Sequence, residues 1–415
     1  MNATFDSGEN CAEPLHKGLA AALRKTTETL ASELAHPSNV APDWSDFEWL
    51  VARAVAAMHG VSPLLSRVLR WQGPAGWAEF LADQRHHTES RYQRIRELLL
   101  LLDQRARHGG IAILSLKGAA LHTIGIYVAG ERPMADVDLL VREEDAQRTV
   151  QMLQALGFDE THTMWKHIVF EPSARRVPVA FGENCSNDIK IELHTRIIEI
   201  LPRRIADVSD LVFPERPHPG LNDYKSNASL MIHLLLHAAG AMVARAVRLL
   251  NLHDVAQLAA HMTDRDWDEV LLCRNSRREP FWWAYPPLAL TARYYGSIPD
   301  RILAALAADC PWTLRQICRR RTLSDVSFSY LWVSAFPGIE WTLSVREMLV
   351  YAAQRVAPGA EVRALRTVIA RTQPFAAGSS WNHMSQSRRI LRWMTSRQAR
   401  AETLHPVRMA LAQRP

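Results

Sequence analysis

The chain has 415 residues, of which 48% are hydrophobic and 22% charged. This is the composition of an ordinary globular protein, and the length allows two or three domains around a large core. The first residues contain neither a basic nor an apolar segment, so the sequence predicts no secretory signal. The most apolar long stretch, residues 230–244, is interrupted by two histidines and is too short and too polar to cross a bilayer. These features exclude a membrane-spanning protein and predict a cytoplasmic one.

The five cysteines argue against two classes of site. Their number is odd and no pair has the C-x-x-C spacing, so the sequence predicts neither a disulfide framework nor a cysteine-based zinc site. We therefore expect free thiols at Cys11, Cys185, Cys273, Cys310 and Cys318.

The formal net charge of +6 comes from an excess of arginine, part of which is concentrated in residues 319–321 and 386–415. Such an excess suits a polyanionic partner such as RNA. Solvated helix faces and basic tails are the more common explanation, so the charge alone is weak support for nucleic-acid binding. The arginines of the last segment, which face the single acid Glu402, are Arg388, Arg389, Arg392, Arg397, Arg400, Arg408 and Arg414.

The N-terminal part of the chain is predicted to be helical. Residues 1–16 are polar and lack periodicity, and we expect them to form a flexible leader. From residue 17 to residue 107, apolar residues recur at helical spacing with few breakers, which indicates an N-terminal helical module. Gly109 and Gly110 then end the last helix, and residues 111–114 have the apolar character of a short buried strand.

The segment from residue 108 to residue 205 alternates between helix and strand patterns. Gly118 opens a helix, residues 137–141 form a strand, and residues 142–156 form an amphipathic helix that Gly157 ends. Further strands are predicted over residues 168–170, 177–181 and 189–193. This alternation indicates a core of helices and strands over residues 108–205.

Helical spacing returns after a breaker-rich connection at residues 214–220. It predicts a C-terminal helical module over residues 225–400, followed by a basic tail at residues 401–415. Within the module, His233 and His237 have the i, i+4 spacing of a zinc-binding pair. No glutamate follows the first histidine and no third ligand is evident, so we expect packed or hydrogen-bonded histidines.

Asp136 and Asp138 are the residues that carry most information about function. They lie one residue apart at the start of an apolar, β-prone run, which puts both carboxylates on the same side of a strand end, about 6.5–7 Å apart. Acids are depleted in strands and costly near a core, so such a pair calls for a compensating cation or hydrogen-bond donor. The pair therefore predicts a divalent-metal site.

Glu192 is a candidate third carboxylate. The period of two in the strand 188–193 sends Asp188, Lys190 and Glu192 to one polar face. If this strand lies beside the strand that begins at Asp136, the three carboxylates form the ligand set that a two-magnesium phosphoryl-transfer site needs. The alternative is an exposed strand residue paired with Lys190 or a neighbour. His194 is expected to point to the opposite strand face and to be structural.

Lys117 and Gly118 lie where a strand turns into a helix. Glycine lets a phosphate approach the backbone, the helix start offers free N–H groups, and the lysine adds a point charge. A Lys-Gly pair at a turn is often only a turn, so the motif is not specific. Arg132 is a candidate for a bidentate phosphate contact, although a loop arginine is as often solvated.

Taken in order, the segments 116–121, 132–141, 155–158 and 191–194 resemble a bacterial family of uncharacterised nucleotidyltransferases within the polymerase-β-like superfamily. The shared features are a Lys-Gly turn, an arginine followed by Asp-x-Asp, and a Glu-Leu-His strand. The superfamily resemblance covers about residues 108–205. The family resemblance also includes the helical approach around His59 and the downstream segment from residue 237 to residue 254.

The resemblance implies an α+β fold, in which a polymerase-β-like nucleotidyltransferase core with a mixed sheet is flanked by N-terminal and C-terminal helical modules. It implies that Asp136 and Asp138 bind Mg²⁺, or Mn²⁺ in its place, and that Glu192 is the third carboxylate. The superfamily usually has Gly-Ser where this chain has Lys117 and Gly118, and the interval to the first acid is longer here. Arg248 and Asp254 fall where the family tends to have basic and acidic residues. Such residues form either a ligand-facing surface or an interhelical ion pair, and we expect the ion pair.

The leading hypothesis is a Mg²⁺-dependent nucleotidyltransferase that moves a nucleoside monophosphate from a nucleoside triphosphate such as ATP to an acceptor, releasing pyrophosphate. Asp136, Asp138 and Glu192 are the expected catalytic and metal-binding residues, and Lys117, Gly118 and Arg132 the expected nucleotide-binding residues. The acceptor can be a small molecule, a peptide or protein, or RNA. The alternative is a catalytically weak binding or regulatory protein of the same fold, for example a partner in a toxin–antitoxin pair or in peptide biosynthesis. The sequence indicates neither the preferred nucleotide nor the oligomeric state.

Overall fold

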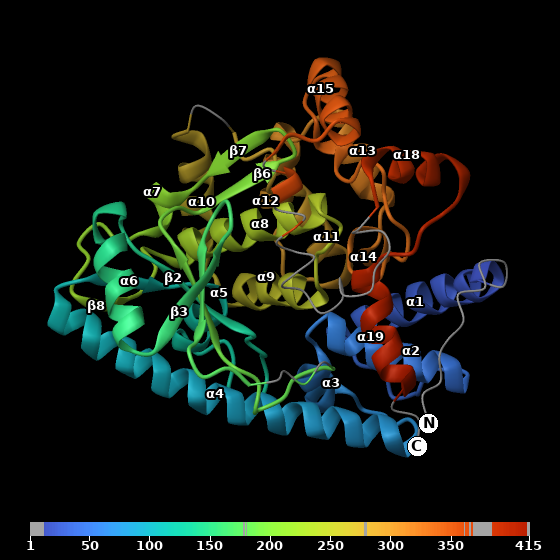
Figure 1. The fold of residues 1–415 in the computed structure, drawn as a ribbon, viewed down its shortest axis with the longest axis horizontal. Helices are drawn as coiled ribbons and strands as arrows, with labels where there is room; N and C mark the ends of the chain where they lie inside the picture. The colour runs from blue at the N-terminus through green and yellow to red at the C-terminus, as the bar shows by residue number, and fades with distance from the viewer. Residues whose placement is uncertain are drawn as a thin grey trace.

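The computed structural model describes residues 12–412 except 177–178, 180, 278–279, 361, 365–366 and 368–383, and for residues 12–17 it describes only the backbone. A six-stranded sheet lies on one side of the molecule and most helices lie on the other (Figure 1). The helices that precede the sheet in the chain are α1 (Ala12–Ala35), α2 (Asp46–Met58), α3 (Ser62–Val68) and α4 (Ala75–Gly109).

The sheet is mixed, with the strand order β3-β4-β5-β2-β1-β8. β2 runs parallel to β5 and β1 runs parallel to β8, whereas the other neighbours are antiparallel. The mixed α+β architecture expected from the resemblance is therefore confirmed. The strands are β1 (Ala112–Ser115), β2 (Asp136–Leu140), β3 (Phe158–Thr163), β4 (Ile168–Pro172), β5 (Lys190–His194) and β8 (Gly220–Asn222), and a separate hairpin consists of β6 (Ile198–Leu201) and β7 (Arg204–Asp207).

Short helices connect the strands, and longer helices follow the sheet. The connecting elements are α5 (Lys117–Thr123), η1 (Glu143–Asp145), α6 (Ala146–Ala155) and α7 (Ser209–Val212). The later elements are α8 (Asn227–Val243), α9 (Leu249–His261), α10 (Asp264–Asn275), α11 (Tyr285–Tyr294), α12 (Asp300–Asp309), α13 (Trp312–Arg320), α14 (Leu323–Val326), η2 (Ile339–Trp341), α15 (Val345–Val356), α18 (Gln386–Thr395) and α19 (Ala401–Ala412). No helix in the described part of the chain combines the length and the apolar character needed to cross a membrane.

Helix α4 supports the sheet and positions the segment that leads into β2 (Figure 1). Its second half packs Ile95, Leu102 and Ala106 into the apolar core that the sheet shares. Gly110 ends the helix in the left-handed conformation, with φ of 64°, which a residue without Cβ adopts at no steric cost. In the middle of the helix, the buried Arg91 donates to the carbonyl oxygens of Met134 (3.2 Å), Ala135 (3.1 Å) and Asn187 (2.8 Å). The two backbone segments that enter β2 and β5 are thus held by one side chain.

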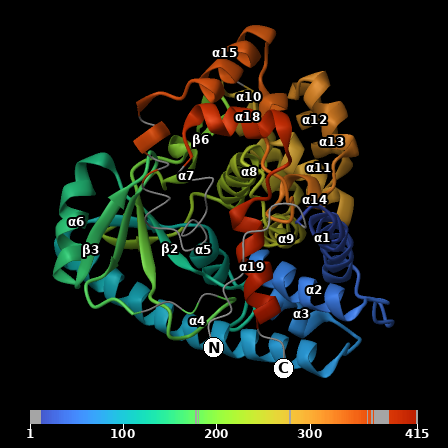
Figure 2. The ribbon, with the colours of Figure 1, turned by 45° about the vertical axis from the view of Figure 1, so that its right-hand side comes forward.

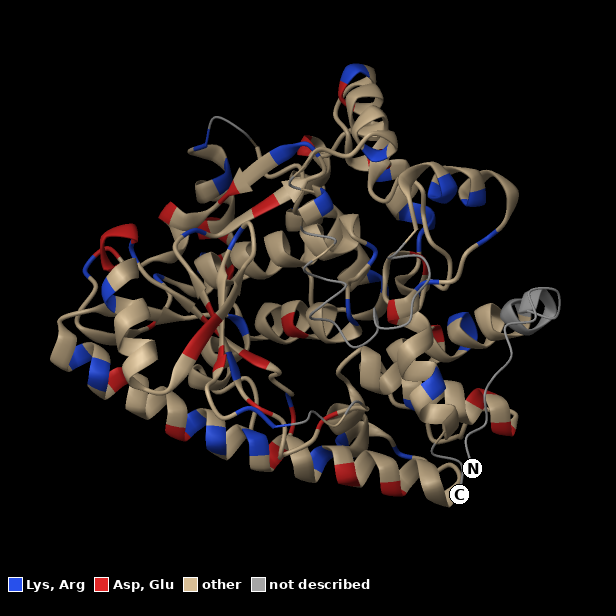
Figure 3. Ribbon diagram, in the orientation of Figure 1, with Lys and Arg blue, Asp and Glu red and all other residues tan. Residues whose placement is uncertain are grey.

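The helices at the two ends of the chain share a second, larger apolar core. This core contains Leu23 and Val55 from α1 and α2, Leu234 and Val255 from α8 and α9, and Val407 from α19. Helix α19 lies against α2, as two views of the ribbon show (Figures 1 and 2). Helix α18 carries basic and no acidic side chains (Figure 3).

Several expectations from the sequence can be compared with these elements. The strands expected at 111–114, 137–141, 168–170 and 189–193 are present within one or two residues. Of the strand expected at 177–181, Val179 and Phe181 are not in a strand, and residues 177, 178 and 180 lie outside the described residues. Residues 1–11 of the expected leader also lie outside them, and α1 begins at Ala12. The described cysteines are free thiols, and Cys11 is not among them.

Candidate active site

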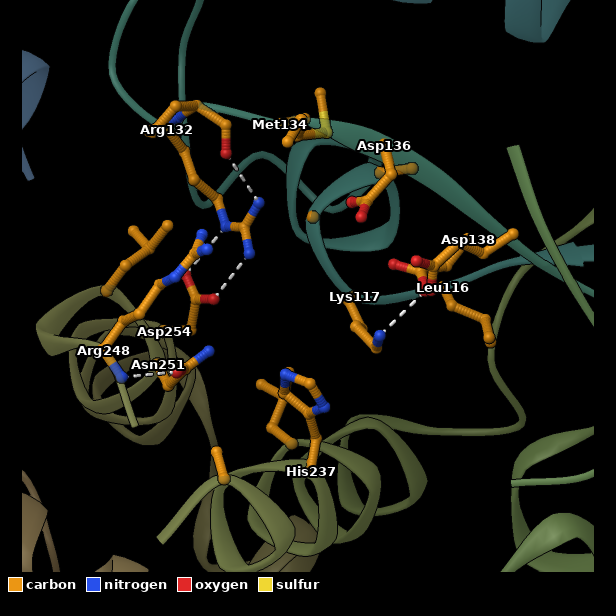
Figure 4. A pocket seen from close by; sticks show the side chains of 18 of the residues that line it. Leu116, Lys117, Arg132, Met134, Asp136, Asp138, His237, Arg248, Asn251 and Asp254 are labelled. Carbon is orange, nitrogen blue, oxygen red and sulfur yellow. Dashed lines mark hydrogen bonds and ion pairs between the residues drawn. The ribbon is translucent and has the colours of Figure 1, made fainter. Parts of the chain in front are cut away.

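The parallel pairing of β2 with β5 brings the three predicted carboxylates together. In the register of these strands, Asp136 lies opposite Lys190 and Asp138 lies opposite Glu192. The expectation that the two strands are neighbours is therefore confirmed. Asp136, Asp138 and Glu192 line one cavity of about 370 Å³, which lies between the sheet and helices α8 and α9 (Figure 4).

Lys117 places an ammonium group inside this cluster. Its Nζ donates to Asp138 Oδ1 at 2.8 Å. Its backbone is left-handed, with φ of 48°, a conformation that costs a residue with a Cβ of order 1 kcal/mol or more. Its backbone N–H donates to Tyr224 Oη at 3.3 Å, and that oxygen lies 2.7 Å from Nδ1 of the buried His233. The expected strand-to-helix turn is present, and its lysine points at the carboxylates.

The carboxylates have very different proton affinities. Burial, together with the negative charges of Asp138 and Glu192, raises the pKa of Asp136 from 3.8 to about 7. Burial also opposes the charged form of Asp138, but the Lys117 ammonium and the hydrogen bond from His194 outweigh it and hold the pKa of Asp138 well below its usual range. Burial opposes the charge of Lys117 as well, and the three carboxylates nevertheless raise its pKa. Lys117 is therefore paired with Asp138 and not with Asp136.

Arg132 forms a buried bidentate ion pair with Asp254 of α9. Its Nε and Nη2 donate to Asp254 Oδ1 (2.9 Å) and Oδ2 (2.7 Å), and its Nη1 donates to the carbonyl oxygen of Pro133 (3.2 Å). Tyr127 Oη donates to the same carboxylate at 2.9 Å. A Cβ at Gly118 would collide with the guanidinium of Arg132, so the glycine makes room for this ion pair.

The expected ion pair between Arg248 and Asp254 is wrong, because Arg132 occupies both carboxylate oxygens of Asp254. The guanidinium of Arg248 instead lies over the ring of Phe328, 5.5 Å from its centroid, and forms no ion pair with the described residues. Arg248 lines the cavity on the wall opposite the carboxylates (Figure 4).

The expectation that His194 points away from Glu192 is wrong. Residues 192 and 194 are two apart, and in a strand this spacing puts both side chains on the same face. His194 Nε2 lies 3.2 Å from Asp138 Oδ1 and 3.8 Å from Glu192 Oε2. These two carboxylates raise the pKa of His194, although burial opposes the charge. The period of two, applied correctly, predicts this placement from the sequence alone.

Two further residues of the cavity were not predicted. His167, at the start of β4, has its Nδ1 3.5 Å from Glu192 Oε2, and burial lowers its pKa from 6.5 to about 4. Lys166 beside it pairs with Glu199 at 2.7 Å. Neither residue belongs to a recognisable motif, and only the antiparallel pairing of β4 with β5 brings them to the site.

The histidine pair of α8 is divided between two environments. His233 is buried and hydrogen-bonded to Tyr224, as expected, whereas His237 lines the cavity with 29% of its side chain exposed. Burial lowers the pKa of both rings well below 6.5, so both are neutral at physiological pH. Neither ring belongs to the group of potential metal ligands found among the described residues.

The chain matches a known family over its central part. The model of the family described as uncharacterised nucleotidyltransferase matches residues 45–295, more than half of the chain. No curated protein and no solved structure matches the chain. The matched segment runs from α2 to the end of α11 and contains every residue of the cavity described above except Phe328. The chain therefore belongs to the family of uncharacterised nucleotidyltransferases.

Proposed function

We propose that the protein is a metal-dependent nucleotidyltransferase of the polymerase-β-like superfamily, which transfers a nucleoside monophosphate from a nucleoside triphosphate to an acceptor. The observation that carries the proposal is the register of β2 and β5, which places Asp138 opposite Glu192 and Asp136 one pleat away, beside a cavity. Membership of the family supports the class of reaction.

The residues fit a divalent cation. Three carboxylates from two neighbouring strands supply the hard oxygen ligands that Mg²⁺ prefers. Three carboxylates share one ammonium, that of Lys117, and this excess of negative charge supports a bound cation. Asp136, Asp138 and Glu192 would hold the metal, and the bound cation would neutralise charge on the phosphates during transfer.

The chain's own residues account for the remaining chemistry. An acceptor oxygen forms a bond to the α-phosphorus, the bond from that phosphorus to the bridging oxygen of pyrophosphate breaks, and Glu192 takes the proton of the acceptor hydroxyl. Lys117, Arg132 and the backbone at Gly118 are the proposed triphosphate contacts. Lys117 and Arg132 are already paired with Asp138 and Asp254, so phosphate oxygens compete with carboxylates for them. Positioning and electrostatic stabilisation are the main sources of rate in such a site.

Removal of the two aspartates tests the proposal. We expect the double variant Asp136→Asn/Asp138→Asn to lose transfer from labelled triphosphates by about a thousandfold or more, because the negative charge that holds the cation is gone. The exposed Asp159→Asn on β3 is the matched control and should keep full activity. Chelation of divalent metal should abolish transfer by the unmodified chain. Undiminished transfer by the double variant would contradict the metal assignment.

The Lys117–Asp138 ion pair favours a second candidate function, a binding or regulatory protein that keeps the fold but has lost efficient transfer. An ammonium at 2.8 Å from Asp138 occupies an oxygen that the metal needs. Calorimetric titration with each of four nucleoside triphosphates in magnesium separates the two functions. Heat of binding supports the transferase, whereas its absence for all four supports the regulatory protein.

A further inference from the structure

A group of nitrogen donors lies directly beside the carboxylates. One ligand atom from each of His167, Glu192 and His194 can be chosen so that all three lie within 4.8 Å of one another. The histidines come from adjacent antiparallel strands, in which Ile168 pairs with Leu193, and their ring centroids are 5.0 Å apart. This spacing suits donors that share one cation.

The ring of His167 has a buried nitrogen without a hydrogen-bond partner among the described residues. Only 9% of its side chain is exposed, and its Nδ1 has no hydrogen-bond partner among the described residues. That atom faces Glu192 Oε2 at 3.5 Å. Buried polar atoms are nearly always paired, and an unpaired one costs about 1–3 kcal/mol, so this nitrogen points to a ligand that the protein chain does not supply.

We propose that His167, Glu192 and His194 form a mixed nitrogen and oxygen site for a first-row transition-metal dication such as Mn²⁺ or Zn²⁺. Imidazole is a good ligand for Zn²⁺, and Mn²⁺ is held by mixed carboxylate and histidine ligands in di-manganese proteins, whereas Mg²⁺ prefers oxygen ligands alone. Asp138 Oδ1, 3.2 Å from His194 Nε2, is within reach as a fourth donor. The inference shares Glu192 and Asp138 with the proposed function and deepens it, because it assigns the position at Glu192 to a different class of metal from the position at Asp136.

Magnetic resonance on the unmodified full chain tests the ligand set without any substitution. Protein labelled with ¹⁵N-histidine and loaded with two equivalents of Mn²⁺, so that the position at Asp136 is filled as well, should show hyperfine coupling from histidine nitrogen in pulsed electron paramagnetic resonance. Coupling to water protons alone, with no histidine nitrogen, would overturn the inference. This readout does not depend on catalytic activity.

Calorimetric titration of variants locates the site. Loss of a ligand should weaken Zn²⁺ binding by about tenfold or more in His167→Ala and in His194→Ala, with little change in Mg²⁺ binding. His86→Ala, on the exposed face of α4, is the matched control and should bind Zn²⁺ as the unmodified chain does. Unchanged Zn²⁺ affinity in His167→Ala would refute the site.

The outcomes separate this inference from the proposed function. If Asp136→Asn/Asp138→Asn abolishes transfer while His167→Ala leaves Zn²⁺ affinity unchanged, the transferase stands and the nitrogen site is refuted. If the histidine nitrogens couple to Mn²⁺ but no triphosphate is turned over by the unmodified chain, the metal site stands and the transferase is refuted.

Discussion

The buried ion pair of Arg132 with Asp254 is the main polar link between the loop before β2 and helix α9. Only 9% of the arginine side chain and 1% of the aspartate side chain are exposed. The bidentate geometry and the additional hydrogen bond from Tyr127 satisfy both carboxylate oxygens, which is the condition under which a buried pair persists. Removal of either charge leaves the other one buried and unpaired.

Substitution of Asp254 should therefore destabilise the fold strongly. We expect Asp254→Asn to lower the free energy of unfolding by about 3 kcal/mol, because the guanidinium of Arg132 keeps its charge but loses its counter-charge. Asp264→Asn is the control, since 90% of the Asp264 side chain is exposed in its ion pair with Arg301 and such pairs contribute about 0–1 kcal/mol. Urea unfolding measures the free energy of unfolding of both variants. An equal decrease in the two variants would contradict a structural role of the buried pair.

At the scale of elements, His59 joins three helices. It follows α2, and its Nδ1 accepts a hydrogen bond from the N–H of Leu249 at the start of α9 (2.8 Å). With Nδ1 as an acceptor, Nε2 carries the proton and donates to Ser329 Oγ (2.8 Å), which in turn accepts from Thr27 of α1 (2.6 Å). The ring is fully buried, so burial and the charge of Arg248 lower the pKa of His59 from 6.5 to about 3.

This shift makes stability depend on pH. Below about pH 6.5 the unfolded chain protonates His59, whereas the folded chain does so only near pH 3, so the contribution is complete above pH 6.5 and declines as the pH falls. Between about pH 7.5 and pH 5, the unmodified chain should lose about 2 kcal/mol more stability than His59→Gln, which cannot titrate. Denaturant unfolding at the two pH values measures the difference. Parallel losses in both proteins would show that His59 is not responsible.

The sequence predicted local features of the site better than its long-range contacts. The period of two identified β2 and β5 and the face of Glu192, because alternation is a property of each strand alone. The pairing of Arg132 with Asp254 spans 122 positions and leaves no local signal, so the nearer Arg248 was chosen wrongly. The short β8 escaped detection, because its three residues begin at Gly220, the last residue of the breaker-rich segment at 214–220. His167 was missed for the same reason as the pairing of Arg132 with Asp254, since only tertiary structure brings His167 to Glu192.

At the scale of the whole molecule, helix α19 packs into the same apolar core as helices α1 and α2. Val407 and Ala410 of α19 are buried, and Thr403 Oγ1 donates to the carbonyl oxygen of Phe328 at 2.6 Å. Phe328 lies over the cavity beside Arg248. The end of the chain therefore contributes to the stability of the cavity wall without lining the cavity.

A charged side chain at the buried face of α19 should destabilise the packing of this helix against the core. We expect Val407→Asp to lower the free energy of unfolding by about 3 kcal/mol, because it buries an unpaired carboxylate in place of an apolar side chain. Arg408→Asp, at the exposed neighbouring position, should change it by less than about 1 kcal/mol. Thermal unfolding compares the two. Similar melting temperatures would mean that α19 is dispensable for the core.

The left-handed backbone at Lys117 has a consequence for the order in which a metal ion and a substrate would bind. Because the turn places an ammonium among three carboxylates, the chain itself supplies a counter-ion to the site. In the proposed function, metal binding would exchange this cation for another and release Lys117 from Asp138. The released lysine would then be free to contact an incoming phosphate, which would couple metal binding to substrate binding through one side chain.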